Sequence, residues 1–75
     1  MQTIFEMKKG DKRKIVKINS DSELKNRFNS FGISRGSIVT LENCNPNREN
    51  LEIKVGGTHI ALRKSEAKSI EVEND

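Results

Sequence analysis

The feature that most constrains the fold of this sequence is a pair of short apolar runs separated by two glycines. Leu51–Val55 and Thr58–Leu62 each alternate apolar and polar residues, and Gly56-Gly57 lies between them. Alternation with a period of two is typical of a strand with one buried face, and a two-residue turn fixes the register of a β-hairpin. In that register three cross-strand pairs share one face: Val55 with Thr58, Ile53 with Ile60, and Leu51 with Leu62. Turn chemistry and hydrophobic pattern therefore predict the same hairpin.

Further strands are predicted on both sides of this hairpin. Lys12–Ile18 follows the turn signal Gly10-Asp11 and is rich in β-branched residues, which suit a pleated surface. Ile38–Leu41 starts a second strand, and Ile70–Val72 is a last short one. Glu42–Asn50 contains four Asn and the only Pro, so a polar loop is expected there.

One helix of about ten residues is predicted between the first two strands. Ser20 and Glu23 fit the capping box that opens a helix. One apolar stripe follows at helical spacing, formed by Leu24, Phe28 and Phe31. Gly32 then stands where a left-handed residue ends a helix, with Ile33 after it to pack back on the last turn. We expect the stripe, including both phenylalanines, to be buried.

The sum of these elements is a mainly β chain with four or five short strands. Ser65 is expected to cap a single helical turn before the last strand. A chain of 75 residues buries only about 60% of the surface that its unfolded form exposes, which favours one domain over residues 1–75. Four or five short strands of this kind predict a small barrel of the SH3-like or OB-like type.

The residues that could carry chemistry do not form a catalytic or metal-binding set. Cys44 and His59 are the only Cys and the only His. The hairpin register places His59 opposite Lys54, away from the core, where an ammonium group disfavours a bound cation. We therefore expect no enzyme activity, no metal, no cofactor and no small-molecule substrate. No membrane span or signal peptide is recognisable, so a cytoplasmic location is expected.

A cluster of basic residues near the start raises nucleic-acid binding as an alternative function. The cluster comprises Lys8, Lys9, Lys12, Arg13, Lys14 and Lys17. Single-strand binding on small barrels uses aromatic stacking platforms, and the predicted burial of Phe28 and Phe31 leaves Phe5 alone. The acidic C-terminal stretch, which ends at Asp75, would also repel a phosphate backbone. Nucleic acid is thus the less favoured partner.

Three motifs in this order resemble those of the ferrous iron transport protein A (FeoA) family of small bacterial cytoplasmic proteins. They are Ile4-x-x-Met7-x-x-Gly10-Asp11, Arg27-Phe28-x-x-Phe31-Gly32-Ile33-x-x-Gly36, and Ile60-Ala61-Leu62-Arg63-Lys64-x-Glu66-Ala67. The resemblance runs from about Ile4 to Val72. It implies an SH3-like barrel of about five strands with a helix inserted between the first and second. Phe28 and Phe31 replace commoner aliphatic residues, Arg35 stands where many members have Pro, and the tip Asn45–Arg48 departs from the usual pattern.

The resemblance also implies a partner, the membrane ferrous iron permease FeoB, which has a cytoplasmic GTP-binding domain. The chain would be a non-enzymatic accessory that docks on this permease to regulate or assemble it, at the inner face of the membrane. For the contact we predict the helix, its following turn and the hairpin tip, with these residues: Leu24, Arg27, Arg35, Asn45, Pro46, Asn47 and Arg48. Homo-oligomerisation through exposed strand edges is a further alternative.

Overall fold

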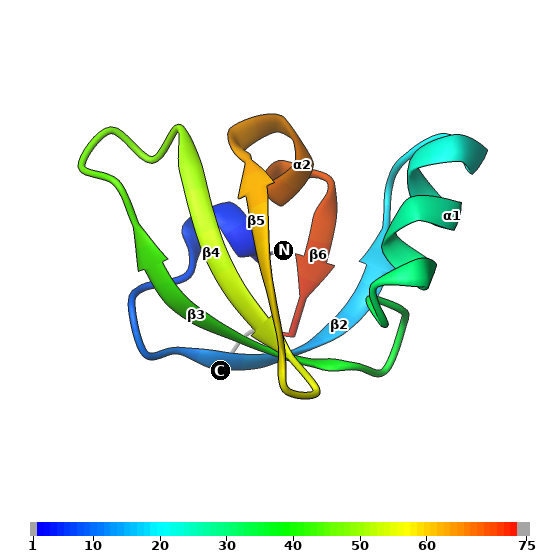
Figure 1. The fold of residues 1–75 in the computed structure, drawn as a ribbon, viewed down its shortest axis with the longest axis horizontal. Helices are drawn as coiled ribbons and strands as arrows, with labels where there is room; N and C mark the ends of the chain where they lie inside the picture. Colours follow the sequence, from blue (N-terminus) through cyan, green and yellow to red (C-terminus); the bar gives the residue numbers. More distant parts are fainter. Residues whose placement is uncertain (1, 74–75) are drawn as a thin grey trace.

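The computed structural model, which describes residues 2–73, contains the hairpin that the two glycines predict (Figure 1). Leu51 pairs with Leu62, Ile53 with Ile60 and Val55 with Thr58, in the predicted register. All of these residues except Thr58 are buried, so one face of the hairpin belongs to the core. Gly56 and Gly57 both have positive φ values, 57° and 93°. A two-residue turn of this type needs that conformation, which glycine adopts without steric cost.

The described chain contains six strands, one more than the five expected at most. In chain order the elements are β1 (Gln2–Thr3), the 3-10 turn η1 (Ile4–Glu6), β2 (Lys12–Ile18), α1 (Ser22–Ser30), β3 (Ile38–Cys44), β4 (Asn50–Val55), β5 (Thr58–Arg63), α2 (Lys64–Lys68) and β6 (Ile70–Val72). The strands follow the order β1-β6-β2-β3-β4-β5, and all pairs are antiparallel. The fold is SH3-like and mainly β, with α1 inserted as predicted, although β1 and β5 remain as edges and the sheet does not close.

Strand β2 bends this sheet because its two halves pair with different neighbours. Lys12–Lys14 pairs with β3, whereas Ile15–Ile18 pairs with β6. The register shifts between Ile15 and Lys17, which indicates a bulge, and a second shift lies between Leu41 and Asn43 in the β3–β4 pair. A bulge bends its strand and increases the local twist, so the sheet can wrap around one core.

The core contains aliphatic residues from every strand except β1, together with residues from both helices and from η1. It comprises Ile4, Met7, Ile15, Phe28, Ile33, Val39, Leu41, Leu51, Ile53, Val55, Ile60, Leu62, Ala67, Ile70 and Val72. Helix α1 contributes one fully buried side chain, Phe28, and lies at the side of the sheet (Figure 1). The short helix α2 covers the end of the core beside η1.

Helix α1 begins one residue later than the capping box predicts. Asp21, not Ser20, is the N-cap, and its Oδ1 accepts a hydrogen bond of 2.8 Å from the Leu24 backbone N–H. The Ser20 hydroxyl is instead buried, with no hydrogen-bond partner among residues 2–73. Asp and Ser are equally good N-caps, so the sequence Ser-Asp-Ser leaves the choice to the packing of the chain that enters the helix.

Replacing the N-cap should destabilise the protein, whereas replacing the neighbouring serine should not. We expect Asp21→Ala to lower the free energy of unfolding by about 1 kcal/mol, because the Leu24 N–H loses its acceptor. Ser20→Ala serves as the matched control and should cost nothing, since it removes a buried hydroxyl that has no partner. Urea unfolding monitored by circular dichroism measures both. Equal losses in the two variants would contradict the assignment of the cap.

Three further boundaries differ from the sequence-based expectation. Strand β3 continues to Cys44, so the polar loop is shorter than predicted, residues 45–49. Helix α2 begins at Lys64 rather than after a Ser65 cap, because the Glu66 carboxylate accepts a 2.8 Å hydrogen bond from the Arg63 N–H. Helix α1 ends at Ser30, which places Phe31 beyond the helix; it is 39% exposed, so its predicted burial is wrong. Asp75 of the acidic stretch lies outside the described residues.

Candidate functional site

The end of helix α1 and the turn after it are held rigidly by backbone hydrogen bonds. Gly32 has a φ of 85°, as predicted for the helix end, and the Ile33 N–H returns to the Phe28 carbonyl at 2.9 Å. Ile33 is fully buried, which anchors the chain at this point. The next turn is tied to β2, since the Gly36 N–H donates to the Ile15 carbonyl and the Ile15 N–H to the Ser37 carbonyl, both at 2.8 Å.

This segment contains two exposed apolar side chains and two exposed arginines. Phe31 is 39% exposed and Ile38 47%, and these are the only large hydrophobic residues exposed to that degree within residues 2–73. Arg27 and Arg35 are also exposed, and Leu24 is half-buried against the core. We call Leu24, Arg27, Phe31, Arg35 and Ile38 the helix–turn surface. It includes three of the seven predicted contact residues.

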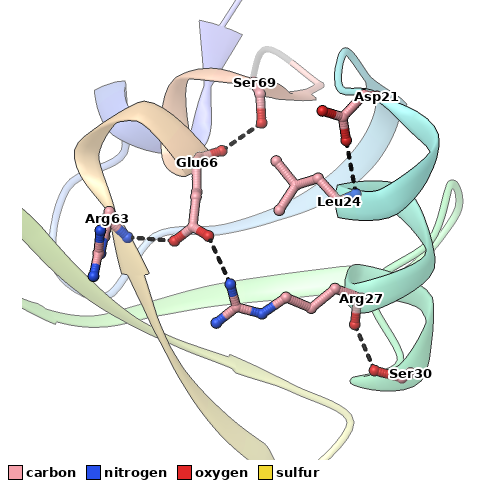
Figure 2. Close-up of polar contacts among 7 residues, drawn as sticks. All are labelled: Asp21, Leu24, Arg27, Ser30, Arg63, Glu66 and Ser69. Atoms are coloured by element: carbon pink, nitrogen blue, oxygen red, sulfur yellow. Dashed lines mark hydrogen bonds and ion pairs between the residues drawn. The ribbon is translucent and has the colours of Figure 1, made fainter.

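Arg27 connects this surface to helix α2. Its Nη1 lies 3.4 Å from Oε2 of Glu66, and its guanidinium carbon lies 5.9 Å from the centroid of the Phe31 ring. Figure 2 shows Leu24 and Arg27 both pointing from α1 towards α2, where Glu66 also holds the Arg63 backbone. The Arg27 side chain is 60% exposed and that of Glu66 13%, and an ion pair whose cation is in water contributes only about 0–1 kcal/mol. Arg27 can therefore exchange Glu66 for a carboxylate of a partner at little cost.

The hairpin tip places its four predicted residues in two different roles. Asn45 and Arg48 are half-buried and hold the loop together: the Asn45 carboxamide oxygen accepts from the Asn50 N–H at 3.0 Å, and the Arg48 N–H donates to the Asn45 carbonyl at 2.9 Å. The Arg48 guanidinium reaches further, to the backbone carbonyls of Phe5 and Met7. Pro46 and Asn47 are exposed. The Asn47 carboxamide oxygen accepts a local hydrogen bond of 3.2 Å from the Glu49 N–H, two residues further along the loop.

The helix–turn surface and the hairpin tip do not lie together. Figure 1 shows the loop between β3 and β4 at one end of the long axis of the molecule and helix α1 at the other. The molecule extends 30 Å along that axis. The seven predicted contact residues therefore belong to two separate surfaces, and a small contact area can include only one of them.

Sequence reasoning missed the exposed apolar pair, although a signal for one member was present. Val39 and Leu41 are buried, and a period of two places Ile38 on the opposite face. The burial of Phe31 is predicted wrongly, because its position seven residues after Leu24 continues the apolar stripe only if the helix includes it. The helix ends at Ser30. A cluster of basic residues around Phe5 was also missed, since its members come from three distant parts of the chain.

Cys44 lies on β3 and His59 on β5, with β4 between the two strands. Within residues 2–73 no group of three or more His, Cys, Asp or Glu side chains is close enough to hold a metal ion. His59 pairs with Lys54 across the hairpin, as predicted, and its Nδ1 lies 3.7 Å from Oε1 of Glu42. Cys44 is half-buried at the end of β3. None of the helices in residues 2–73 is long and apolar enough to span a bilayer.

These features define a small SH3-like domain with an inserted helix and two exposed apolar side chains in the segment after its core residue Phe28. Residues 3–74 match the model of the FeoA domain family. The chain belongs to the FeoA family.

Individual relatives agree with this assignment. A protein of Helicobacter pylori named as an Fe(2+) transport protein A is 41% identical over 66 residues, which span 87% of this chain and 85% of that protein. A fusion of Fe(2+) transport protein A with the transporter FeoB in Porphyromonas gingivalis is 28% identical over 70 residues, 93% of this chain and 8% of the fusion. The crystal structure of Stenotrophomonas maltophilia FeoA complexed with zinc, named as an SH3-domain protein, superposes with a TM-score of 0.85 at 26% identity over 97% of this chain and 91% of that one.

Proposed function

We propose that this protein is a non-enzymatic accessory of ferrous iron transport that docks on the cytoplasmic part of a FeoB-type permease. The fusion in Porphyromonas gingivalis supports the pairing, because it joins an FeoA domain and the transporter FeoB in one chain. Covalent linkage of two modules keeps them at a high effective concentration, which is useful when they act together. Where the two modules are not joined, the contact must form through the surface of the FeoA domain alone.

The observation that carries the proposal is the exposure of Phe31 and Ile38 in a part of the fold that is otherwise well ordered by hydrogen bonds. Interfaces obtain most of their binding energy from a few buried side chains, and aromatic residues and arginine are enriched at interface cores. The helix–turn surface has this composition, with Phe31 and Ile38 as apolar anchors, Arg27 beside the Phe31 ring, and Arg35 exposed in the following turn. Glu66 keeps Arg27 in place until a partner offers its own carboxylate.

Docking of this kind acts on the permease by binding, without chemistry in the accessory itself. A domain that binds one conformation of the permease more tightly than another shifts the equilibrium between them, and the shift equals the difference in binding free energy. Such binding can regulate the GTP-binding domain, or it can assemble the complex. The two effects differ in a measurable way, because only regulation changes the GTPase rate of a permease that is already assembled.

The proposal is tested by binding to a purified FeoB-type permease in detergent at physiological salt. We expect the double substitution Phe31→Ser with Ile38→Thr to weaken binding at least about tenfold, since it removes both apolar anchors while leaving the core intact. The matched control is Pro46→Ala with Asn47→Ser in the exposed hairpin tip, which should bind as the unmodified protein does. Biolayer interferometry on immobilised permease gives both affinities.

Two outcomes would contradict the proposal in different ways. A loss of binding in the tip variant alone would move the contact to the other end of the molecule. Binding of the unmodified protein to RNA or DNA, with none to the permease, would replace the transport function with the nucleic-acid alternative. Circular dichroism of both variants excludes unfolding as the cause of any loss.

A further inference from the structure

Three cationic side chains converge on one phenylalanine at the end of the molecule that α2 and η1 cover. The Lys68 Nζ lies 4.8 Å from the centroid of the Phe5 ring, the Lys64 Nζ 5.7 Å, and the Arg48 guanidinium carbon 5.9 Å. Phe5 itself is half-buried and rests on the core. We call Phe5, Arg48, Lys64 and Lys68 the Phe5 cluster. It joins η1, the β3–β4 loop and α2, which are far apart in the sequence.

The cluster is strongly cationic because no carboxylate of the described residues forms an ion pair with it. Within residues 2–73 the ion pairs involve Arg13, Arg27 and His59, and none involves Arg48, Lys64 or Lys68. Lys64 and Lys68 are four residues apart and therefore share one face of α2. Glu66 lies between them in sequence but on the other face, where it holds Arg27 and the Arg63 backbone. The short helix thus separates its charges, with the cations towards Phe5.

Lys64 and Lys68 of the cluster also line an open groove. It has a volume of about 450 Å³ and is lined by Glu49, Asn50, Arg63, Lys64, Ser65 and Lys68. Three cations and one carboxylate line it, and Arg48 adds a fourth cation next to the shared lysines. Like charges brought this close repel one another, and attraction to the ring offsets only part of that repulsion. The arrangement is complementary to an anion.

We propose that the Phe5 cluster and its groove form a docking surface for the headgroups of anionic phospholipids. Lysines around a partly exposed aromatic ring are typical of proteins that lie on a membrane surface, because the cations attract lipid phosphates while the ring and the lysine stems contact the apolar boundary. The open shape of the groove suits a surface of many phosphates better than a single enclosed ligand. The occupant is therefore a membrane, and the phosphate of its lipids is the group recognised.

A nucleic acid offers the same phosphates but fits the cluster less well. Binding of single strands relies on bases stacked on aromatic rings. The Lys68 ammonium lies over the Phe5 ring at 4.8 Å, where a base would have to stack. A lipid headgroup makes no such demand, since its phosphate binds the ammonium and needs no stacking on the ring.

This surface is separate from the helix–turn surface and does not depend on it. The Phe5 cluster uses the lysine face of α2, whereas the contact to α1 uses the Glu66 face. Both surfaces can be occupied together, so that the protein meets the membrane with one and a protein partner with the other. Vesicles contain no permease, so lipid binding and the proposed function can fail independently.

The experiment measures co-sedimentation with vesicles of phosphatidylcholine, with and without phosphatidylglycerol, at low and at physiological salt. The unmodified protein should bind only vesicles with phosphatidylglycerol, and more weakly as salt rises. Each near-surface cation changes the partition coefficient roughly fivefold, so Lys64→Gln with Lys68→Gln should weaken binding about 25-fold. The matched control is Lys14→Gln with Lys54→Gln, two exposed lysines on strands, which removes the same net charge. It should bind within about twofold of the unmodified protein.

Two further measurements connect binding to the cluster itself. Lys64→Arg with Lys68→Arg should restore full binding, because the charges are kept. The chain has no Trp, so Phe5→Trp introduces one fluorescent reporter, whose emission should shift to the blue with phosphatidylglycerol vesicles. Equal losses in the two glutamine variants, an unchanged emission, or preferential binding of RNA in competition with vesicles would each overturn the proposal.

Discussion

Phe28→Ala is expected to lower the free energy of unfolding by about 3–5 kcal/mol, the largest effect on stability that we predict for this chain. The ring is only 1% exposed and is the single fully buried side chain that helix α1 contributes to the core. Its removal leaves a cavity that the surrounding strands cannot fill, because the interior is close-packed. Domains of this size have little stability in reserve, so the variant should be partly unfolded at room temperature.

Phe31→Ala is the matched control, since it removes the same ring from the next turn of the chain. The Phe31 ring is 39% exposed, so the substitution should cost less than about 1 kcal/mol. Urea unfolding curves of the two variants and the unmodified protein give both values. A larger loss for Phe31→Ala than for Phe28→Ala would mean that α1 packs on the sheet with a different face, and the helix–turn surface would lose one of its two apolar anchors.

The parts of the fold that the sequence predicts are those determined by local chemistry. The β4–β5 hairpin needs only two glycines and an alternating pattern, and both its strands and its register are confirmed. The turn at Gly32 is confirmed for the same reason, since a helix end in the left-handed region favours glycine. Where two local signals compete, as with Ser20 and Asp21, the sequence does not decide between them. The edge strand β1 has only two residues and depends on its pairing with β6, which no local pattern reveals.

The candidate sites were less predictable because they depend on where a helix stops and on long-range contacts. Helix α1 ends one residue before Phe31, so Phe31 turns outward instead of continuing the apolar stripe. The sequence does not predict a helix end to within one residue. The Phe5 cluster combines side chains separated by more than forty positions in the chain. Arg48 is the clearest case. The sequence does not distinguish a loop arginine that binds backbone carbonyls from a loop arginine that is solvated.

Arg48→Ala is expected to lower the free energy of unfolding by about 1.5–3 kcal/mol, the range for hydrogen bonds to a charged group. The guanidinium donates to the backbone carbonyls of Phe5 and Met7, the latter at 3.2 Å, and so ties the β3–β4 loop to the N-terminal segment. Alanine leaves both carbonyls without this donor. Urea unfolding measures the loss, and a change below about 0.5 kcal/mol would show that the tie contributes nothing to stability.

Arg48→Gly separates the contribution of the side chain from that of the backbone. Arg48 is the one residue other than glycine with a positive φ in residues 2–73, 58°, a conformation that costs an L-residue roughly 1–2 kcal/mol. Alanine keeps this strain and glycine removes it, while both lose the guanidinium. Arg48→Gly should therefore be more stable than Arg48→Ala by roughly 1 kcal/mol, although less stable than the unmodified protein. If the glycine variant were as stable as the unmodified protein, the free energy of the backbone strain would equal that of the lost hydrogen bonds. The Arg48 side chain and its backbone conformation would then give no net stability to the fold, and the remaining contribution of Arg48 would be its charge in the Phe5 cluster.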